Sequence, residues 1–221
     1  MALDIELEEA RRLVEASSRV LVLTGAGIST DSGIPDFRGP DGLWTKNPGA
    51  EEASDIGVFV SDENARKAFW RMMASLQSDG RGPKPNTGHR ALLQLEEQKK
   101  LRMLVTQNVD GLHQAAGTNP ELVVEVHGNT QESCCLSCGE PRPIAEVLPQ
   151  IETGEDLHCH CGGLLKANVV LFGEALPPLA LAMAFEAARD CDLLICIGST
   201  LSVYPVAAIV PEAKDCGAKL L

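Results

Sequence analysis

The sequence VLVLTGAGIS at residues 20–29 decides how the rest of the chain is interpreted. Its four leading aliphatic residues predict a buried parallel strand. Gly25 and Gly27 then predict a turn that lets backbone N–H groups approach a pyrophosphate. The dinucleotide fingerprint also requires a third glycine and an acidic residue about 20 positions further on. Position 30 is a threonine, and the chain continues into the loop sequence PDGLW at residues 40–44. The stretch alone fits an unusual nucleotide loop and an ordinary strand–turn–helix equally well.

The composition limits the class of protein. The 221 residues are 44% hydrophobic and only 4% aromatic, which is enough for one sizeable aliphatic core and a small satellite domain. A formal net charge of −12 argues against direct binding of nucleic acid, which requires a basic surface. The chain has no apolar run of about 18 residues that would span a membrane, and its acidic N-terminus is unlike a signal peptide. We therefore expect a cytoplasmic protein without a membrane partner.

Apolar runs alternate with amphipathic segments along the chain. We predict strands at residues 20–23, 103–106, 122–126, 169–172, 193–197 and from Ala218, and helices at residues 3–17, 62–76, 87–99, 177–189 and 206–214. Residues 39–56 are rich in Gly and Pro and are expected to form a long loop. The alternation predicts an α/β fold with a doubly wound, Rossmann-like parallel sheet. We assign residues 1–45, 86–130 and 166–221 to that sheet domain, 46–85 to a cofactor loop and helical module, and 131–165 to a zinc-ribbon module.

Small and polar residues follow four of the predicted strands. They are GAG at residues 25–27, QNVD at 107–110, HGN at 127–129 and GST at 198–200. Ligands of open parallel sheets bind outside the carboxyl ends of the strands. Ordinary turn chemistry explains any one of these segments, whereas all four together favour a shared binding site.

Four of the eight cysteines occur in two close pairs. Cys135 and Cys138 are separated by two residues, and Cys159 and Cys161, 20 residues later, by one. Such pairs predict a structural zinc ribbon, because each can supply two thiolates to a tetrahedral ion. The tight second pair leaves His158 as an alternative ligand to Cys159. Four buried or unpaired thiols are the competing interpretation.

Taken in order, the motifs resemble those of the sirtuin family of NAD-dependent protein deacylases in its bacterial form. The motifs are GAGIS at 25–29, GIPDFR at 33–38, TQNVDGLH at 106–113, HGN at 127–129, the cysteine pairs, VLFGE at 170–174 and GSTLSVYP at 198–205. The resemblance implies an enzyme that consumes NAD as a co-substrate while it removes acetyl or other neutral acyl groups from protein lysines. Nicotinamide and O-acyl-ADP-ribose would be the products, and zinc would be structural.

The resemblance also implies roles for single residues. The acyl-lysine carbonyl oxygen attacks C1′ of the nicotinamide ribose, and His127 then acts as general base on the ribose hydroxyls. Imidazole suits this task because its pKa lies near neutrality. Asn108 and Asp110 belong to the catalytic set and line the ribose and nicotinamide pocket, while Phe37 shields the ribose carbon from water. The implied NAD-binding residues are Gly25, Ala26, Gly27, Ser29, Asp36, Phe37, Arg38, Gln107, Asn108, Asp110, Gly198, Ser199 and Thr200.

The family resemblance assigns the substrate side to two segments. The strand at residues 169–172 would bind the substrate backbone by strand addition, through Val170, Phe172 and Gly173. Relatives that remove succinyl or malonyl groups carry Tyr-x-x-Arg where this chain has WRMM at residues 70–73. Without arginine at the fourth position, an acidic acyl group has no bidentate partner. Trp70 and Met73 would instead form an apolar wall, so we expect neutral acyl groups, acetyl first.

Two other functions stay open at the level of sequence. One is mono-ADP-ribosyl transfer in the same pocket, and the other is a non-catalytic NAD- or peptide-binding fragment. The final residues AKLL at 218–221 stop inside an expected strand, before the turn that contacts the adenosine ribose in the family. We therefore expect a shortened chain with weakened NAD binding. A dehydrogenase is disfavoured by the missing third glycine and the missing acidic residue.

Overall fold

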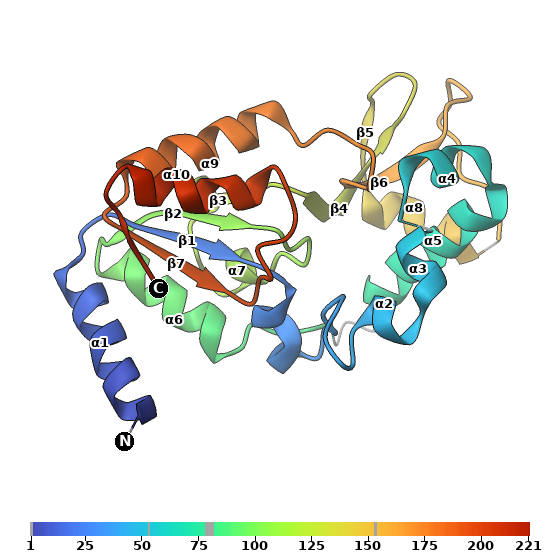
Figure 1. Ribbon diagram of the computed structural model, residues 1–221. Helices are drawn as coiled ribbons and strands as arrows, with labels where there is room; N and C mark the ends of the chain where they lie inside the picture. The colour runs from blue at the N-terminus through green and yellow to red at the C-terminus, as the bar shows by residue number, and fades with distance from the viewer. Residues whose placement is uncertain (1, 53, 78–81, 153) are drawn as a thin grey trace.

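A five-stranded parallel sheet forms the larger part of the computed structural model, which describes residues 2–52, 54–77, 82–152 and 154–221 (Figure 1). In spatial order its strands are β3 (Val123–Glu125), β2 (Leu101–Thr106), β1 (Val20–Thr24), β7 (Leu193–Ile197) and β8 (Lys219–Leu220). All four neighbouring pairs are parallel. The doubly wound sheet predicted from the sequence is thereby confirmed.

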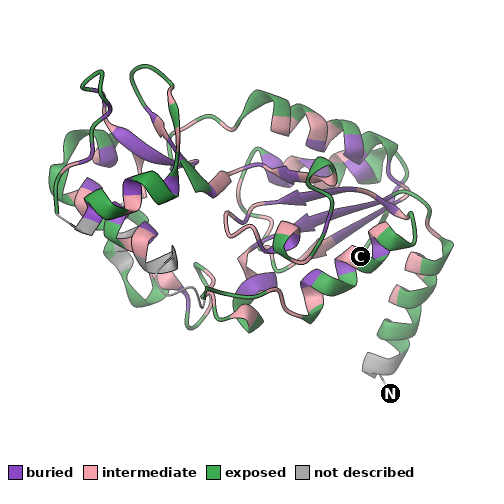
Figure 2. Ribbon diagram, turned by 180° about the vertical axis from the view of Figure 1, so that it is seen from behind, coloured by how far each residue is buried: buried purple, intermediate pink, exposed green. Residues whose placement is uncertain are grey.

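Helices cover both faces of this sheet, which explains why its central strands are continuously apolar (Figure 2). One face, with Leu21, Leu23 and Val105, packs against α9 (Pro178–Asp190) and α10 (Ile209–Asp215). The opposite face, with Val20, Val22 and Leu104, packs against α6 (Thr87–Glu97) and α1 (Ala2–Ala16). Because successive strand residues alternate between the faces, β1 contributes to both cores.

A second, three-stranded sheet lies beside the first (Figure 1). Its spatial order is β5 (Pro141–Pro143), β4 (Gly128–Cys135) and β6 (Leu165–Val169), and both pairings are antiparallel. It shares a core with α4 (Ile56–Ser61), α5 (Glu63–Gln77) and α8 (Ile144–Glu152). In the β4–β6 ladder, Gly128 pairs with Val169 at one end and Cys135 with Leu165 at the other. The ladder therefore connects the residue after His127 to the first cysteine of the cluster.

Two predicted elements are wrong. Residues 39–56 are not one long loop, because they contain α2 (Leu43–Lys46), α3 (Pro48–Glu52) and the start of α4. The carboxylate of Asp55 accepts the N–H groups of Gly57 and Val58, which caps α4. Of the strand predicted at residues 169–172, only Val169 lies in a strand, because β6 ends there. Beyond that point the backbone leaves the ladder and contacts other segments, as described below.

The other predicted boundaries differ only slightly from the observed ones. Asp62 caps α5 as expected, since its carboxylate accepts the N–H groups of Asn64 and Ala65. The helix predicted at residues 206–214 is a 3-10 turn, η3 (Val206–Ala208), followed by α10. Among the described helices, none is both long and apolar enough to cross a membrane.

Candidate active site at the strand ends

The turns that follow β1, β2, β3 and β7 lie at one edge of the parallel sheet. The arrowheads of β1, β2 and β7 in Figure 1 point toward the side on which the three-stranded sheet lies. Backbone bonds join the turns directly: Gln107 N–H donates to Thr24 O at 2.9 Å, and Val126 N–H to Thr106 O at 3.1 Å. The predicted convergence of the four polar strand ends is therefore observed.

The glycine turns after β1 and β7 are packed against each other. Gly25 N–H donates to Ile197 O, and Gly27 N–H donates to Gly198 O, both at 2.9 Å. A Cβ on Gly27 would lie 2.7 Å from Gly198 Cα, and one on Gly25 would lie 2.7 Å from Gly198 O. Both glycines are thus required by the contact between two turns. Their N–H groups already donate within the protein, which corrects our expectation that they would face a pyrophosphate.

Ser29, in the 3-10 helix η1 (Ala26–Ser32), is the centre of a polar network. Its hydroxyl donates to Asp110 Oδ2 at 2.7 Å and accepts from Asn108 Nδ2 at 3.2 Å. Asn108 Nδ2 also donates to Gly25 O at 3.2 Å, and Asp110 Oδ1 accepts Leu112 N–H at 2.9 Å. Ser29 and Asn108 are buried. The network fixes the amide and the carboxylate before any ligand binds.

His127 follows β3 and is held through one ring nitrogen. Its Nδ1 lies 3.0 Å from the carbonyl oxygen of Gln107. Since a carbonyl can only accept, Nδ1 carries the hydrogen and Nε2 is the basic nitrogen. Burial lowers the pKa of His127, and the contact with Gln107 opposes this only partly. The imidazole is therefore neutral at pH 7, which is the form a general base requires.

Gln107 connects His127 to the turn after β7. Its Oε1 accepts the hydroxyl hydrogen of Ser199 at 2.7 Å, and the same hydroxyl accepts Leu201 N–H at 3.2 Å. The predicted NAD-binding segment after β2 is thus hydrogen-bonded to the segments after β1 and β7. The segments after β1 and β7 are in turn held together by their glycine contacts. Thr200 is different, because it is exposed and its Oγ1 contacts Ser202 Oγ at 2.6 Å.

Two buried histidines, His89 and His113, lie near the Ser29 network, and no sequence motif assigns either a catalytic role. The rings of His89 and His113 are 4.9 Å apart between centroids. His113 Nε2 lies 3.0 Å from Thr24 Oγ1, which itself donates to Thr106. Burial lowers the pKa of His113 to about 4. His113, in α7 (Leu112–Ala115), is therefore a structural residue, and it remains neutral.

His89 belongs to the N-terminal capping box of α6, which the sequence analysis missed. The side chain of Asn86 accepts the N–H of Gly88 and donates to Ile28 O at 2.7 Å. His89 Nε2 lies 3.5 Å from Ser29 Oγ. An asparagine directly before a predicted helix start was the available indication of this cap. The cap fastens α6 to η1.

The predicted NAD-binding residues Asp36, Phe37 and Arg38 contact the helices α2 and α3. Asp36 Oδ1 accepts Gly39 N–H at 2.8 Å. The Phe37 ring lies 4.6 Å from the Trp44 ring, and the Arg38 guanidinium lies 4.4 Å over the same ring. Arg38 also pairs with Glu51 at 3.1 Å. The structure therefore places these three residues against α2 and α3 and does not bring them into the Ser29 network.

The predicted substrate segment lies between His127 and residues 54–56. Val170 N–H donates to His127 O at 2.9 Å, so the segment begins beside the proposed base. Phe172 N–H donates to Ser54 O at 2.9 Å and Phe172 O accepts Ile56 N–H at 3.0 Å. Gly173 has a φ of +84°, which favours glycine. One backbone edge at Phe172 is thus already paired within the chain.

The two predicted acyl-pocket residues pack in the core of the smaller unit. Trp70 is 2% exposed and its Nε1 donates to Leu165 O at 3.3 Å, while Met73 is 5% exposed in the same cluster. Core packing accounts for both side chains without a ligand. Trp70 and Met73 are therefore core residues of this unit.

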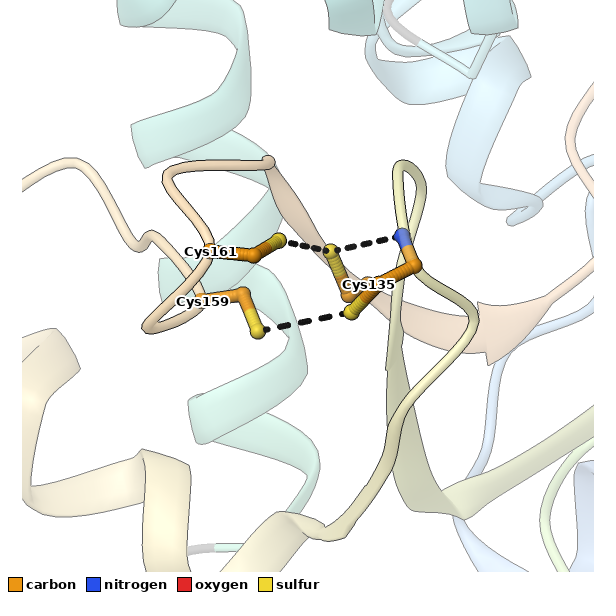
Figure 3. A group of neighbouring side chains, drawn as sticks. Cys135, Cys159 and Cys161 are labelled. Atoms are coloured by element: carbon orange, nitrogen blue, oxygen red, sulfur yellow. Dashed lines mark hydrogen bonds between the residues drawn. The ribbon is translucent and has the colours of Figure 1, made fainter.

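The four predicted zinc ligands converge between β4 and β6, with sulfur atoms within 4.8 Å of one another (Figure 3). The Cys135–Cys161 and Cys138–Cys159 sulfur distances are 3.5 and 3.8 Å. A tetrahedral ion with zinc–sulfur bonds of about 2.3 Å separates its sulfurs by about 3.8 Å. Hydrogen bonds from neighbouring groups, the Cys138 N–H first, lower the pKa of Cys135 to about 6, which favours the thiolate.

This geometry fits structural zinc and includes Cys159 in the cluster. The alternative ligand, His158, instead contacts Asp156 at 3.3 Å through Nε2 and Gly162 O at 3.2 Å through Nδ1. The cluster and His127 are at opposite ends of the β4–β6 ladder. The metal would therefore stabilise that ladder without entering the chemistry.

Known proteins match this chain over nearly its whole length. The sequence pattern of the Sir2 family matches residues 25–205. An NAD-dependent protein deacetylase of Thermodesulfovibrio yellowstonii is 41% identical over 218 residues, which cover 98% of this chain and 83% of that protein. A solved structure of Sir2 with a p53 peptide and NAD+ has a TM-score of 0.83 at 37% identity, over 97% of this chain and 84% of the other.

A second solved structure, of Sir2 bound to a propionylated peptide, has a TM-score of 0.81 at 35% identity, over 97% of this chain and 84% of the other. Both the family match and the structural similarity thus agree with the resemblance inferred from the residues. The chain belongs to the Sir2 family.

Proposed function

We propose that this protein removes acetyl, or other neutral acyl groups, from protein lysines with NAD as co-substrate. The observation that carries the proposal is the hydrogen-bonded network of Ser29, Asn108 and Asp110 at the sheet edge that also holds the neutral His127. The similar deacetylase and the Sir2 structure with peptide and NAD+ support the same assignment. We place this chemistry in the cytoplasm, as composition led us to expect.

The residues present fit the NAD that the family implies. When bound, NAD supplies an electrophilic ribose carbon and nicotinamide as a leaving group. Asp110 accepts one hydrogen bond at each carboxylate oxygen, so lone pairs remain to accept from a carboxamide NH2. Asn108 would orient a ribose hydroxyl or a water. We assign the NAD site to residues 1–45, 86–130 and 166–221, with 46–85 as the cofactor-loop module and 131–165 as the zinc-ribbon module.

His127 would accept the ribose hydroxyl proton at Nε2. Its Nδ1–H already donates to Gln107 O, and this bond strengthens when the ring becomes positively charged. The carbonyl therefore fixes the tautomer and stabilises the imidazolium. Removal of the ring should slow deacylation about 10²- to 10⁴-fold, which is typical for loss of a general base.

The substrates would be proteins with acylated lysines, bound beside residues 170–173. Val170 and Phe172 lie there with Gly173, one hydrogen bond from His127. The family resemblance implies that an acidic acyl group is disfavoured, because WRMM at residues 70–73 has no arginine at its fourth position to pair with it. We propose no contact with nucleic acid or membrane, in keeping with the net charge of −12.

Mass spectrometry of one reaction tests the proposal against its two alternatives. The protein is incubated with NAD and an acetyl-lysine peptide, with His127→Ala as control. We expect deacetylated peptide and O-acetyl-ADP-ribose from the wild type and a severe loss of both in the variant. ADP-ribose attached to protein would favour the transferase, and NAD binding without any product would favour a binding module.

A further inference from the structure

We propose that the buried ion pair between Lys166 and Glu174 is a positioning device for the substrate segment at residues 170–173. Lys166 is in β6, and only 4% of its side chain is exposed. Its Nζ lies 3.0 Å from Glu174 Oε2, and 23% of the Glu174 side chain is exposed. A buried ammonium requires such a partner, because an unpaired charge in the interior is strongly unfavourable.

The ammonium group of Lys166 has three acceptors, two in β6 and one beyond it. Besides Glu174, the ammonium donates to the carbonyl oxygens of Ala167 and Val169. Val169 is the last residue of the β4–β6 ladder, paired with Gly128. Lys166 therefore holds the point at which the chain leaves the sheet and enters the substrate segment.

Glu174 fixes the other end of the same segment. Its Oε2 accepts Leu171 N–H at 2.7 Å, while its own N–H donates to Leu171 O at 3.1 Å. The carboxylate thus closes a tight turn over residues 171–174 and connects that turn to Lys166. With Val170 N–H bonded to His127 O, the segment is held at both ends and beside the proposed base.

The inference rests on the proposed function, because it assigns the orientation of the peptide-binding segment to this pair. Neither side chain is assigned a contact with the reacting atoms. Loss of the pair should release the turn and weaken binding of the acylated peptide. Contacts of NAD with the turns after β1, β2 and β7 should be unaffected, since none of the described contacts of Lys166 or Glu174 reaches them.

The test compares Lys166→Met with Lys166→Arg and with a variant that removes a different ion pair of the same unit. Arg66 and Asp156 form a second buried pair in the smaller unit, 2.6 Å apart with side chains 10% and 13% exposed. Arg66 donates to Phe59 O and Val60 O in α4, and none of its described hydrogen bonds is to residues 170–174. Arg66→Met therefore reports on general destabilisation. The readouts are the Kd of a fluorescein-labelled acetyl-lysine peptide with ADP-ribose present, the Kd of ADP-ribose alone, and KM for each substrate.

We expect Lys166→Met to raise the peptide Kd and KM about tenfold, the effect of losing one hydrogen bond to a charged group. The Kd of ADP-ribose should change less than about twofold in Lys166→Met. Lys166→Arg should bind the peptide as the wild type does. Arg66→Met should lower the Tm and leave the peptide Kd unchanged. An unchanged peptide Kd, or an equal rise in Arg66→Met, would overturn the inference. If Lys166→Met does not fold, Glu174→Gln replaces it, and an unchanged peptide Kd there has the same meaning.

The binding readout separates this inference from the proposed function. If the wild type binds the acetylated peptide without deacetylating it, the proposed function is contradicted. The peptide Kd of Lys166→Met can then still be compared with that of the wild type. Turnover with no selective effect of Lys166→Met contradicts only the inference. Wild-type protein that does not bind the peptide contradicts both.

Discussion

Replacing Gly198 by alanine should separate the two glycine turns that shape the proposed NAD site. Gly198 has a φ of +64°, a conformation that residues with a Cβ rarely adopt. A Cβ there would lie 2.3 Å from Ile28 N and 2.6 Å from Gly27 C. Both atoms belong to the backbone, so no side-chain rotation relieves the overlap. The turns after β1 and β7 must move apart instead.

Alanine substitutions at two other glycines measure separately the cost of a positive φ and the cost of a steric overlap. Gly33 has a φ of +88°, and apart from Gly33 and its chain neighbours no atom of the described residues lies within 4 Å of the position that a Cβ would take. Gly33→Ala should therefore lower the free energy of unfolding by about 1–2 kcal/mol. Gly27→Ala has no such φ but would meet Gly198 Cα at 2.7 Å, which should cost about 1–3 kcal/mol. Gly198→Ala combines both terms, about 2–5 kcal/mol by addition.

Urea denaturation of the three variants measures these losses, and calorimetric titration measures NAD binding. We expect Gly198→Ala to lose more free energy of unfolding than Gly33→Ala. The affinity for NAD should be weakened in Gly27→Ala and Gly198→Ala but not in Gly33→Ala. A Gly198→Ala protein that matches Gly33→Ala in stability and the wild type in NAD affinity would refute the argument. It would mean that the close contact between the turns does not constrain the site.

Three further predictions concern protons and metal. The deacetylation rate should fall as the pH drops through the pKa of His127, which burial holds below the usual 6.5, so a midpoint above 6.5 would contradict the assignment. His113 has a pKa of about 4 in the folded protein, so acid protonates this histidine in the unfolded chain first. The free energy of unfolding should therefore fall by up to about 3 kcal/mol between pH 6.5 and about 4. Urea denaturation at each pH should show that His113→Gln removes most of that loss. Cys135→Ser and Cys159→Ser should lose bound zinc and lower the Tm, as measured by metal analysis and calorimetry, whereas Cys216→Ser, an exposed cysteine outside the cluster, should change neither.

Features with a strong local cause could be predicted from the sequence. The strands β1, β2 and β7 are continuous apolar runs because helices cover both faces of the sheet. The polar residues after them lie together because parallel strands end at one edge. The spacing of Cys135 and Cys138 and of Cys159 and Cys161 placed all four sulfur atoms in one cluster. In each case a few neighbouring residues determine the outcome.

Features that depend on distant contacts could not be predicted. The helices α2, α3 and α4 have four to six residues and are stabilised by contacts such as the Asp55 cap and the packing of Trp44 against Phe37. The reason for glycine at position 27 is its contact with Gly198, far along the chain. The buried pair of Lys166 and Glu174 likewise becomes visible only when both elements are placed.

The most direct test of the account counts nicotinamide and deacetylated peptide in the same reaction by quantitative mass spectrometry. If the strand-end network and His127 form one deacylase site, the wild type should release one nicotinamide for each acetyl group removed. His127→Ala should keep NAD binding and lose deacetylation, because the ring is proposed to act after nicotinamide has left. Nicotinamide release without deacetylated peptide in the wild type, or full deacetylation by His127→Ala, would contradict the central claim.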